Sequence, residues 1–270
     1  MAIHPTAIVD KHAEVDPTAE VGPYCIVHAG ASLGPDTRLL SHVVIHSHTH
    51  LGARNTVHPF ASVGGAPQDL KFGGEPSRLI IGDDNTIRES VTLNRGTEEG
   101  GMETRIGDGC LLMAYSHVAH DCILGNQVIL ANSVSLAGHV VLNDHVIAGG
   151  IAGIHQFCRV GRHAFLAGGA MVTQDILPFT IAQGDRAEHA GVNVVGLRRA
   201  GWSRDQIQAV RSGYRSLFSS EGTRAERLLE TESSLAKESP LIAELCDFVR
   251  SASRGVSGAR GLANGGASVS

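Results

Sequence analysis

Histidines gather in the middle of the chain, and several stand beside another residue that could take part in catalysis. These residues are His117, His120 with Asp121, Gly138 with His139, and His155 with Gln156. A histidine can act as a base near neutral pH, and a neighbouring carboxylate can orient it. A glycine N–H can approach a reacting carbonyl closely and stabilise its oxyanion. The combination predicts acyl transfer to a hydroxyl or an amine. No serine or cysteine stands in an evident nucleophile setting, which favours direct attack by the acceptor.

A six-residue repeat carries these histidines. An aliphatic residue recurs at this interval over residues 3–63, 81–93 and, after a slip of one position, 106–172. About 26 such repeats make chance a negligible explanation. A period of six fits neither the α-helix nor the heptad, whereas three short strands per coil of about 18 residues fit a parallel β-helix. The sequence therefore predicts an all-β parallel β-helix, a triangular prism whose narrow interior holds the aliphatic residues.

The repeat also predicts where the chemistry lies. Because His120 and Gly138 are about one coil apart, they should stack on one face of the prism. A rod of this kind has no interior cavity, so a groove between neighbouring rods is the expected site. A threefold-symmetric trimer would suit a triangular prism.

The domain organisation follows from where the repeat runs and stops. Residues 1–184 are expected to form the β-helix, with loops near 67–79 and 97–104 on one face, which in solenoids is often the binding face. Residues 185–252 are expected to form a small C-terminal α-helical domain. The Gly/Ala/Ser-rich residues 253–270 are expected to be a disordered tail.

Helix signals appear after the repeat stops. Ser203 and Gln206 have the spacing of a capping box for a helix ending near residue 220. Two further helices are predicted at about 223–237 and 241–251.

Charge divides between the two regions. Residues 1–184 carry 10 Lys and Arg against 17 Asp and Glu, whereas residues 185–270 carry 12 against 10. Three arginines share one face of the first predicted helix, namely Arg204, Arg211 and Arg215. This face is either simply solvated or a docking site for an acidic partner.

Composition bounds the class of protein. The chain has 270 residues, a net charge of −5, and only 4% aromatic residues. No apolar run approaches the roughly 20 residues that span a bilayer, and the N-terminus lacks a secretory signal, so a cytoplasmic protein without a membrane segment is expected. The five cysteines have no CxxC spacing, which favours buried thiols over disulfides or a zinc site. We expect no metal, no cofactor and no nucleic-acid partner.

Several short motifs resemble one known family. They are Gln-Asp-Leu-Lys at 68–71, Gly-Glu-Pro at 74–76, Arg-Glu-Ser-Val-Thr at 88–92, His-Val-Ala-His-Asp-Cys at 117–122, Leu-Ala-Gly-His-Val at 136–140, His-Gln-Phe-Cys at 155–158, Ala-Gln-Gly at 182–184, and the run from Gly-Val-Asn to Arg-Arg at 191–199. Together with the hexapeptide repeats, they resemble the UDP-N-acetylglucosamine acyltransferases of lipid A biosynthesis. The resemblance covers residues 1 to about 250.

The resemblance implies a homotrimer of left-handed β-helices with a defined reaction. A (3R)-3-hydroxyacyl chain would pass from acyl carrier protein to the glucosamine 3-position of UDP-N-acetylglucosamine, or of its 3-amino analogue, in the first step of lipid A biosynthesis. His120 would be the general base, Asp121 its orienting partner, and the Gly138 N–H the oxyanion donor. The length of the acyl chain and the choice between hydroxyl and amine remain open.

The resemblance also assigns further residues. Those that position substrate would be Lys71, His117, His139, His155 and Gln156. Those that contact the nucleotide-sugar would be Gln68, Asp69, Asn193 and Arg199. Candidates for setting chain length are Phe165, Gly168 and Arg186, and the carrier protein would dock on Arg204, Arg211 and Arg215. Three positions depart from the family pattern, namely Asn94, Val195 and Ala200.

Other functions compete with this interpretation. A zinc-dependent β-helix enzyme of the γ-carbonic-anhydrase type would use histidines from two subunits, and the segment 41–50 is rich in them: His42, His46, His48 and His50. These occupy positions outside the predicted core, so a solvated or interface face is favoured. A non-catalytic rod and the later-acting N-acyltransferase of the same pathway are the remaining alternatives. The latter normally carries an extra N-terminal domain, whereas here the repeats begin at residue 3.

Overall fold

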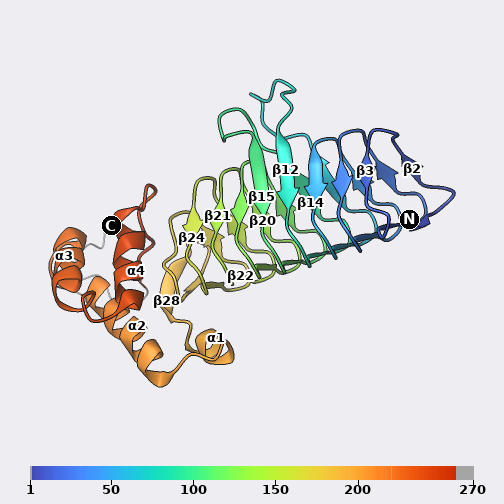
Figure 1. Cartoon of the computed structure of the whole chain (residues 1–270). Helices are drawn as coiled ribbons and strands as arrows, with labels where there is room; N and C mark the ends of the chain where they lie inside the picture. The colour runs from blue at the N-terminus through green and yellow to red at the C-terminus, as the bar shows by residue number, and fades with distance from the viewer. Residues whose placement is uncertain (1, 220, 260–270) are drawn as a thin grey trace.

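The computed structural model describes residues 2–219 and 221–259, and they form a tapering rod with a helical cap (Figure 1). The rod is a parallel β-helix, which confirms the fold predicted from the repeat, and it is left-handed, as the resemblance implied. Among the described residues, no helix is long and apolar enough to cross a membrane.

The strands form three sheets, here named A, B and C, which the chain visits in turn. Pairing within them is parallel except between β27 and β28. Sheet A contains β1 (Ala2–Ile3), β4 (Glu20–Val21), β7 (Arg38–Leu39), β10 (Thr56–Val57), β13 (Thr86–Ile87), β16 (Leu111–Leu112), β19 (Ile129–Leu130), β22 (Ile147–Ala148), β25 (Phe165–Leu166), β27 (Thr180–Gln183) and β28 (Glu188–Val192). Sheet B contains β2 (Ile8–Val9), β5 (Ile26–Val27), β8 (Val44–Ile45), β11 (Ser62–Gly65), β14 (Thr92–Asn94), β17 (His117–Val118), β20 (Ser135–Leu136), β23 (Gly153–Ile154) and β26 (Met171–Val172). Sheet C contains β3 (Glu14–Val15), β6 (Ser32–Leu33), β9 (Thr49–Leu51), β12 (Arg78–Ile81), β15 (Glu103–Ile106), β18 (Ile123–Leu124), β21 (Val141–Leu142) and β24 (Arg159–Val160).

Each repeat sends one aliphatic side chain inward and one residue outward. Val118 and Leu136, from neighbouring coils, are completely buried, and each such side chain stabilises the coil by roughly 1.5–3 kcal/mol. The outward residues form straight columns because the coils pair in register. In sheet B one column comprises Thr92, His117, Ser135, Gly153 and Met171.

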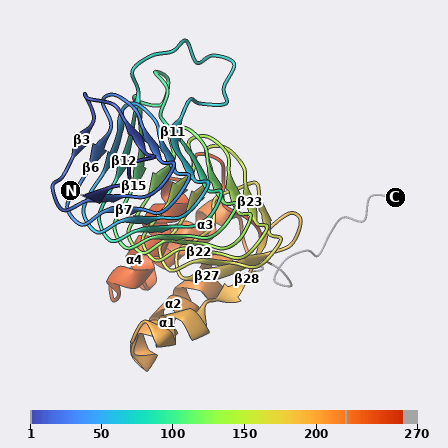
Figure 2. The same cartoon turned by 90° about the vertical axis from the view of Figure 1, so that its right-hand side faces the viewer.

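Two loops interrupt the coil, and both rise from the same side of the rod (Figures 1 and 2). The first connects β11 to β12, and the second connects β14 to β15. They are therefore neighbours in space although the coil from β12 to β14 separates them in the sequence.

The helices follow the last strand and form a second apolar core. They are α1 (Val194–Arg199), α2 (Arg204–Leu217), α3 (Arg224–Ser234) and α4 (Pro240–Arg250). The predicted capping box of α2 is present, because Ser203 and Gln206 each accept the other's backbone N–H. The three predicted helices are confirmed, whereas the short α1 was not predicted from the sequence.

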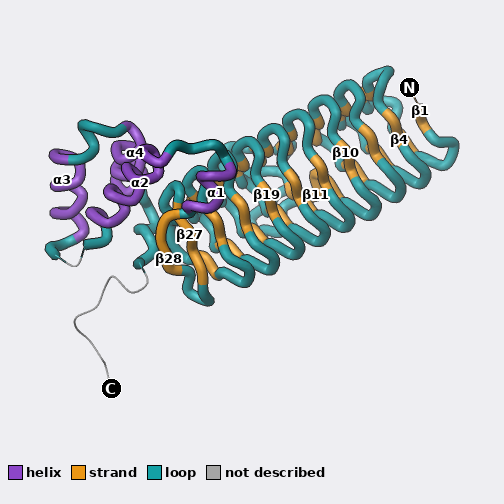
Figure 3. Tube along the Cα trace, turned by 90° about the horizontal axis from the view of Figure 1, so that it is seen from below, coloured by secondary structure: helices purple, strands orange, loops and turns teal. Residues whose placement is uncertain are grey.

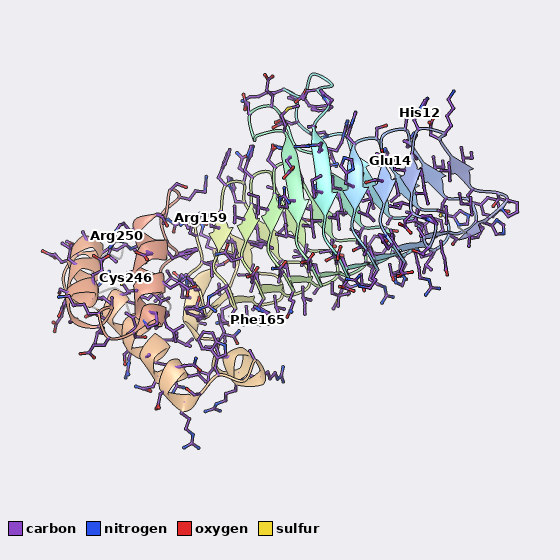
Figure 4. All side chains as sticks on the ribbon, viewed as in Figure 1. His12, Glu14, Arg159, Phe165, Cys246 and Arg250 are labelled. Carbon is purple, nitrogen blue, oxygen red and sulfur yellow. The ribbon has the colours of Figure 1, made fainter. Side chains whose placement is uncertain are left out.

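Arginines join the end of the coil to the helices. Arg159 forms an ion pair with Asp175 at 3.0 Å and donates to the Phe248 carbonyl of α4 at 3.1 Å. Arg162 pairs with Glu244 at 2.7 Å. Figure 4 shows Arg159 at this junction.

The start of the C-terminal tail differs from the prediction. Residues 253–259 were expected to be disordered, yet Val256 pairs with Asp175 and Ala259 with His189 in isolated β-bridges. Burial of Val256 against the helical core favours this ordered path over the flexibility that its Gly- and Ser-rich neighbours suggested. The rest of the tail, residues 260–270, lies outside the described residues.

His189 lies fully buried where β28 meets the tail, and we predict that it makes stability depend on pH. Its Nε2 accepts a hydrogen bond from the Leu177 N–H, so its proton lies on Nδ1, toward the Ser257 and Gly258 carbonyls. Burial lowers the pKa of His189 to about 4. The unfolded chain, with a histidine pKa of about 6.5, therefore takes up this proton first as the pH falls. The stabilisation is complete above pH about 6.5 and is lost toward pH 4, by roughly 3 kcal/mol.

The test compares the wild type with His189→Gln in denaturant titrations between pH 7.5 and 4.5, at one fixed protein concentration. The variant should lose less stability over this range, whatever its starting value. Parallel curves for the two proteins would contradict the assignment.

Candidate active site

His120 and Asp121 lie at the corner between β17 and β18. Asp121 has φ of 60°, the left-handed conformation that turns the chain from one sheet to the next. This conformation directs its carboxylate back toward the preceding histidine, and His120 Nδ1 lies 2.8 Å from Asp121 Oδ2. The Asp121 side chain is 1% exposed and the His120 side chain 12%. A carboxylate that accepts from Nδ1 leaves Nε2 as the unprotonated, basic nitrogen.

Gly138 stacks one coil above His120, as the repeat predicts. A Cβ added to Gly138 would lie 2.5 Å from His120 Cε1, so only glycine permits this approach. Among the described residues the Gly138 N–H has no hydrogen-bond acceptor. The reason lies in the repeat, because the same turn position holds proline elsewhere: Pro5, Pro17, Pro23, Pro35 and Pro59. The fold therefore does not require this N–H to bond within the coil, which leaves the Gly138 N–H available to an oxyanion.

A groove of about 590 Å³ runs beside these residues. The predicted site residues that line it are Gln68, His117, His120, Gly138, His155 and Gln156. Its remaining wall comes from the sheet B column, including Ser135, Gly153 and Met171. The first loop carries Gln68 over the groove and places Asp69 Oδ2 at 3.8 Å from His120 Nε2. His120 therefore lies between two carboxylates, one facing each ring nitrogen.

The other predicted positioning residues surround this centre. His139 packs edge-on against His120, with ring centroids 5.2 Å apart, and burial lowers its pKa. Burial also lowers the pKa of His117, whose Nδ1 lies 2.8 Å from the Thr92 hydroxyl. Both rings are thereby held neutral near pH 7, which suits hydrogen bonding to a polar substrate. Lys71 forms an exposed ion pair with Glu99 at 2.9 Å, joining the two loops.

Asn193 and Arg199 lie elsewhere. They line a second groove of about 510 Å³, formed by α1 against sheet A together with His145 and His163. Figure 3 shows α1 lying over this face. Asn193 is the N-cap of α1, because its side chain accepts from the Gly196 N–H and donates to the His163 carbonyl. Within one chain, the predicted nucleotide-sugar contacts are therefore divided: Gln68 and Asp69 lie at the first groove, and Asn193 and Arg199 lie at the second.

None of the three candidates for chain length lines the first groove, although the turn that holds Arg186 is bonded to the backbone of Met171. Phe165 is an outward residue of sheet A, paired with Ile147 of the second groove, and Figure 4 shows it on the side away from the loops. Gly168 and Arg186 are exposed.

Met171 lines the first groove but was not among the site residues predicted from the sequence. The signal was present, because Met171 follows His117 at three intervals of 18 residues through Ser135 and Gly153.

The three arginines of α2 are all exposed. Arg211 and Arg215 border a depression of about 390 Å³ between α2 and the end of β28. This arrangement is compatible with an acidic partner and equally with a solvated face.

Histidines near Asp121 could also coordinate a metal ion. Donor atoms of His120, Asp121 and His139 lie within 4.8 Å of one another. However, both Asp121 oxygens already accept hydrogen bonds from Thr97, and one also faces His120. Within residues 2–219 and 221–259, the histidines of segment 41–50 form no such group; His46 and His50 instead lie at hydrogen-bond distance from Ser62 and Ser32. The zinc-enzyme alternative therefore receives no support from that segment.

The rod is a β-helix built from six-residue repeats, and a histidine–aspartate pair and a free glycine N–H lie beside its surface groove. This combination is typical of the class of hexapeptide-repeat transferases. Residues 103–138 match the family described as bacterial transferase hexapeptide (six repeats). Residues 175–257 match the second domain of UDP-N-acetylglucosamine O-acyltransferase.

Relatives that match over almost the whole chain identify the family more specifically than these two partial matches. The chain is 49% identical to the acyl-[acyl-carrier-protein]–UDP-N-acetylglucosamine O-acyltransferase of Myxococcus xanthus, over 94% of this chain and 98% of the relative. It is 50% identical to the protein of the same name from Alkalilimnicola ehrlichii, with the same coverage. The solved structure of LpxA from Acinetobacter baumannii superposes with a TM-score of 0.92 at 39% identity, covering 95% of this chain and all of the other. The chain thus belongs to the UDP-N-acetylglucosamine O-acyltransferase family. The resemblance seen in the short motifs is confirmed, and the comparisons do not favour the alternative functions.

Proposed function

We propose that this chain transfers a (3R)-3-hydroxyacyl group from acyl carrier protein to the 3-position of the glucosamine of UDP-N-acetylglucosamine, the first step of lipid A biosynthesis. The single observation that carries the mechanism is the placement of His120 between the Asp121 carboxylate and the free N–H of Gly138. A cytoplasmic location belongs to the same proposal.

The mechanism is a direct transfer. His120 Nε2 takes the proton of the acceptor hydroxyl as the oxygen attacks the thioester carbonyl carbon. The Gly138 N–H donates to the resulting oxyanion, and Asp121 stabilises the imidazolium through Nδ1. Collapse of the tetrahedral intermediate breaks the carbon–sulfur bond, and the departing thiolate receives the proton from His120. No residue of this chain becomes acylated.

The first groove offers the acyl chain an apolar path. Beyond Gly138 its wall includes Gly153 and the exposed side chain of Met171. An alkyl chain laid along them would leave the 3-hydroxyl near the polar end, where the histidines lie. Each buried methylene would contribute about 0.8 kcal/mol to binding.

A homotrimer is part of the proposal. Asn193 and Arg199 belong to α1, which lies against sheet A and away from His120, so a neighbouring copy would have to bring them to the first groove. Two large apolar side chains, Tyr115 and Ile151, project from the corner between sheets A and B, 68% and 69% exposed. Such exposed apolar side chains favour burial between copies. Light scattering on the purified protein tests the stoichiometry, and a monomer at assay concentration would contradict it.

The α2 arginines are proposed to receive the acidic carrier protein. The double variant Arg211→Glu/Arg215→Glu is expected to raise the KM for the acylated carrier about tenfold at low salt, because long-range attraction becomes repulsion. The KM for the nucleotide-sugar should change little. Added salt should reduce the difference between the variant and the wild type in the KM for the acylated carrier. Lys237→Glu, exposed elsewhere in the helical region, is the control. Equal effects of the two variants would contradict docking on this face.

An acyl-transfer assay with purified protein tests the function itself. UDP-N-acetylglucosamine and its 3-amino analogue are each offered with a ladder of 3-hydroxyacyl carrier proteins, and products are identified by mass. We expect transfer to one acceptor with one preferred chain length. Failure with every pair would overturn the proposed function.

A further inference from the structure

The loop between β14 and β15 closes over the carboxylate of Asp121, and Thr97 makes the contact. The Thr97 N–H donates to Oδ1 at 2.8 Å, and the Thr97 hydroxyl donates to Oδ2 at 2.6 Å. We infer that Thr97 is a positioning residue, which holds the Asp121 carboxylate at the angle that orients His120. This inference rests on the proposed function of His120 as the general base.

The rest of the loop is shaped around the same carboxylate. A Cβ on Gly100 would lie 1.9 Å from Asp121 Cγ, so this glycine is required for the loop to close. The Thr97 carbonyl accepts from the Met102 N–H at 2.8 Å, which closes the loop on itself. Below, the Thr104 hydroxyl oxygen accepts the Asp121 backbone N–H at 2.7 Å. The loop thus acts as a lid over the carboxylate rather than as a simple break in the repeat.

The Asp121 carboxylate must be fixed in orientation because two imidazoles face one of its oxygens. His120 Nδ1 lies 2.8 Å from Asp121 Oδ2, and His139 Nε2 lies 3.6 Å from the same atom. If the carboxylate rotated, Oδ2 would move toward His139. His120 would then turn its Nε2 away from the acceptor hydroxyl of the substrate. Hydrogen bonds from one residue to both oxygens fix the carboxylate plane, and such bonds to an ionised group are strong. Misplacement by about 1 Å can lower a catalytic rate about 100-fold.

Thr97 acts from outside the first groove. It is 5% exposed and does not line the first groove. Its replacement should therefore lower kcat and leave KM unchanged, the pattern of a group whose contribution appears in the transition state.

The kinetic test uses Thr97→Val, which keeps the shape and removes the hydroxyl. We expect kcat to fall about 10- to 100-fold, with both KM values unchanged. Thr97→Ser should restore most of the rate. Thr37→Val is the matched control, because Thr37 is equally buried and its hydroxyl donates to the Gly52 carbonyl in a part of the coil remote from the groove. It should leave kcat unchanged.

A double-mutant cycle separates positioning from general stability. If Thr97 works through Asp121, Thr97→Val should cause no further loss in an Asp121→Asn background. An equal fold-loss in both backgrounds would overturn the inference and make Thr97 merely structural.

An NMR measurement tests whether Thr97 holds the Asp121–His120 pair and does not depend on catalytic activity. The His120 Nδ1–H proton, assigned by its absence in His120→Ala, should exchange slowly with water in the wild type and in Thr97→Ser. In Thr97→Val it should exchange faster or disappear. An unchanged proton signal together with an unchanged kcat would overturn the inference and leave the acyl transfer intact. A wild type that transfers no acyl chain would instead refute the proposed function, and the exchange rates would still show whether Thr97 holds the pair.

Discussion

Replacing His120 by alanine is expected to reduce acyl transfer by roughly 10²–10⁴-fold, because this is the usual contribution of a general base to the rate. The His120 side chain is 12% exposed and its Nδ1 is hydrogen-bonded to Asp121. No other histidine can replace it as the base without moving to this position. The KM values should change little, since the groove keeps its other walls.

The control for this variant is His12→Ala. Figure 4 shows His12 near the N-terminal end of the rod, far from the groove. It should retain the wild-type rate. Both variants should keep the wild-type mass by light scattering and a similar melting temperature. Rapid transfer by His120→Ala would refute the role of general base and leave the fold assignment untouched.

Replacing Gly138 by alanine has the second largest expected effect, a loss of roughly 10²–10³-fold in kcat, comparable to removal of an oxyanion-hole donor. The backbone N–H remains, but the new methyl group would lie 2.5 Å from His120 Cε1 and 2.7 Å from Nε2. These distances are far below van der Waals contact, so the imidazole must swing away from the acceptor. The loss therefore combines displacement of the base with obstruction of the reacting carbonyl.

Gly150→Ala provides a matched control in the same turn position of another repeat. There the added Cβ would meet only the Asn132 carbonyl, at an ordinary 3.5 Å. Its activity and stability should stay near those of the wild type. If Gly138→Ala kept the wild-type kcat, His120 could not lie against Gly138 during catalysis as it does in this structure.

The β-helix could be predicted from the sequence because its cause is local and repeated. Each repeat places one aliphatic residue inward at the same position, so the pattern is repeated in every coil and can be recognised from the sequence. The column that joins His117 to Met171 follows from the same period. The helices α2 and α3 were predictable for a similar reason, since a capping box is encoded within four residues.

The loops could not be predicted in this way, because their shape depends on what they cover. The segment 97–104 reads as Glu- and Gly-rich in sequence, yet its course is determined by the Asp121 carboxylate, to which Thr97 donates twice. Likewise, the approach of Asp69 to His120 depends on a loop held by Lys71 and Glu99. The tail 253–259 is ordered because His189 and Asp175 offer it buried hydrogen-bond partners and because Val256 packs into the helical core.

His120, Asp121 and Gly138 were thus predictable as a stacked group from residue type and an 18-residue spacing alone. Their working geometry was decided by tertiary structure. The left-handed turn at Asp121 sets the hydrogen bond to Nδ1, the absence of a Cβ at Gly138 sets the distance to the imidazole, and the lid at Thr97 sets the angle of the carboxylate. Periodicity places residues on a face, but only contacts between coils and loops can determine which atoms meet.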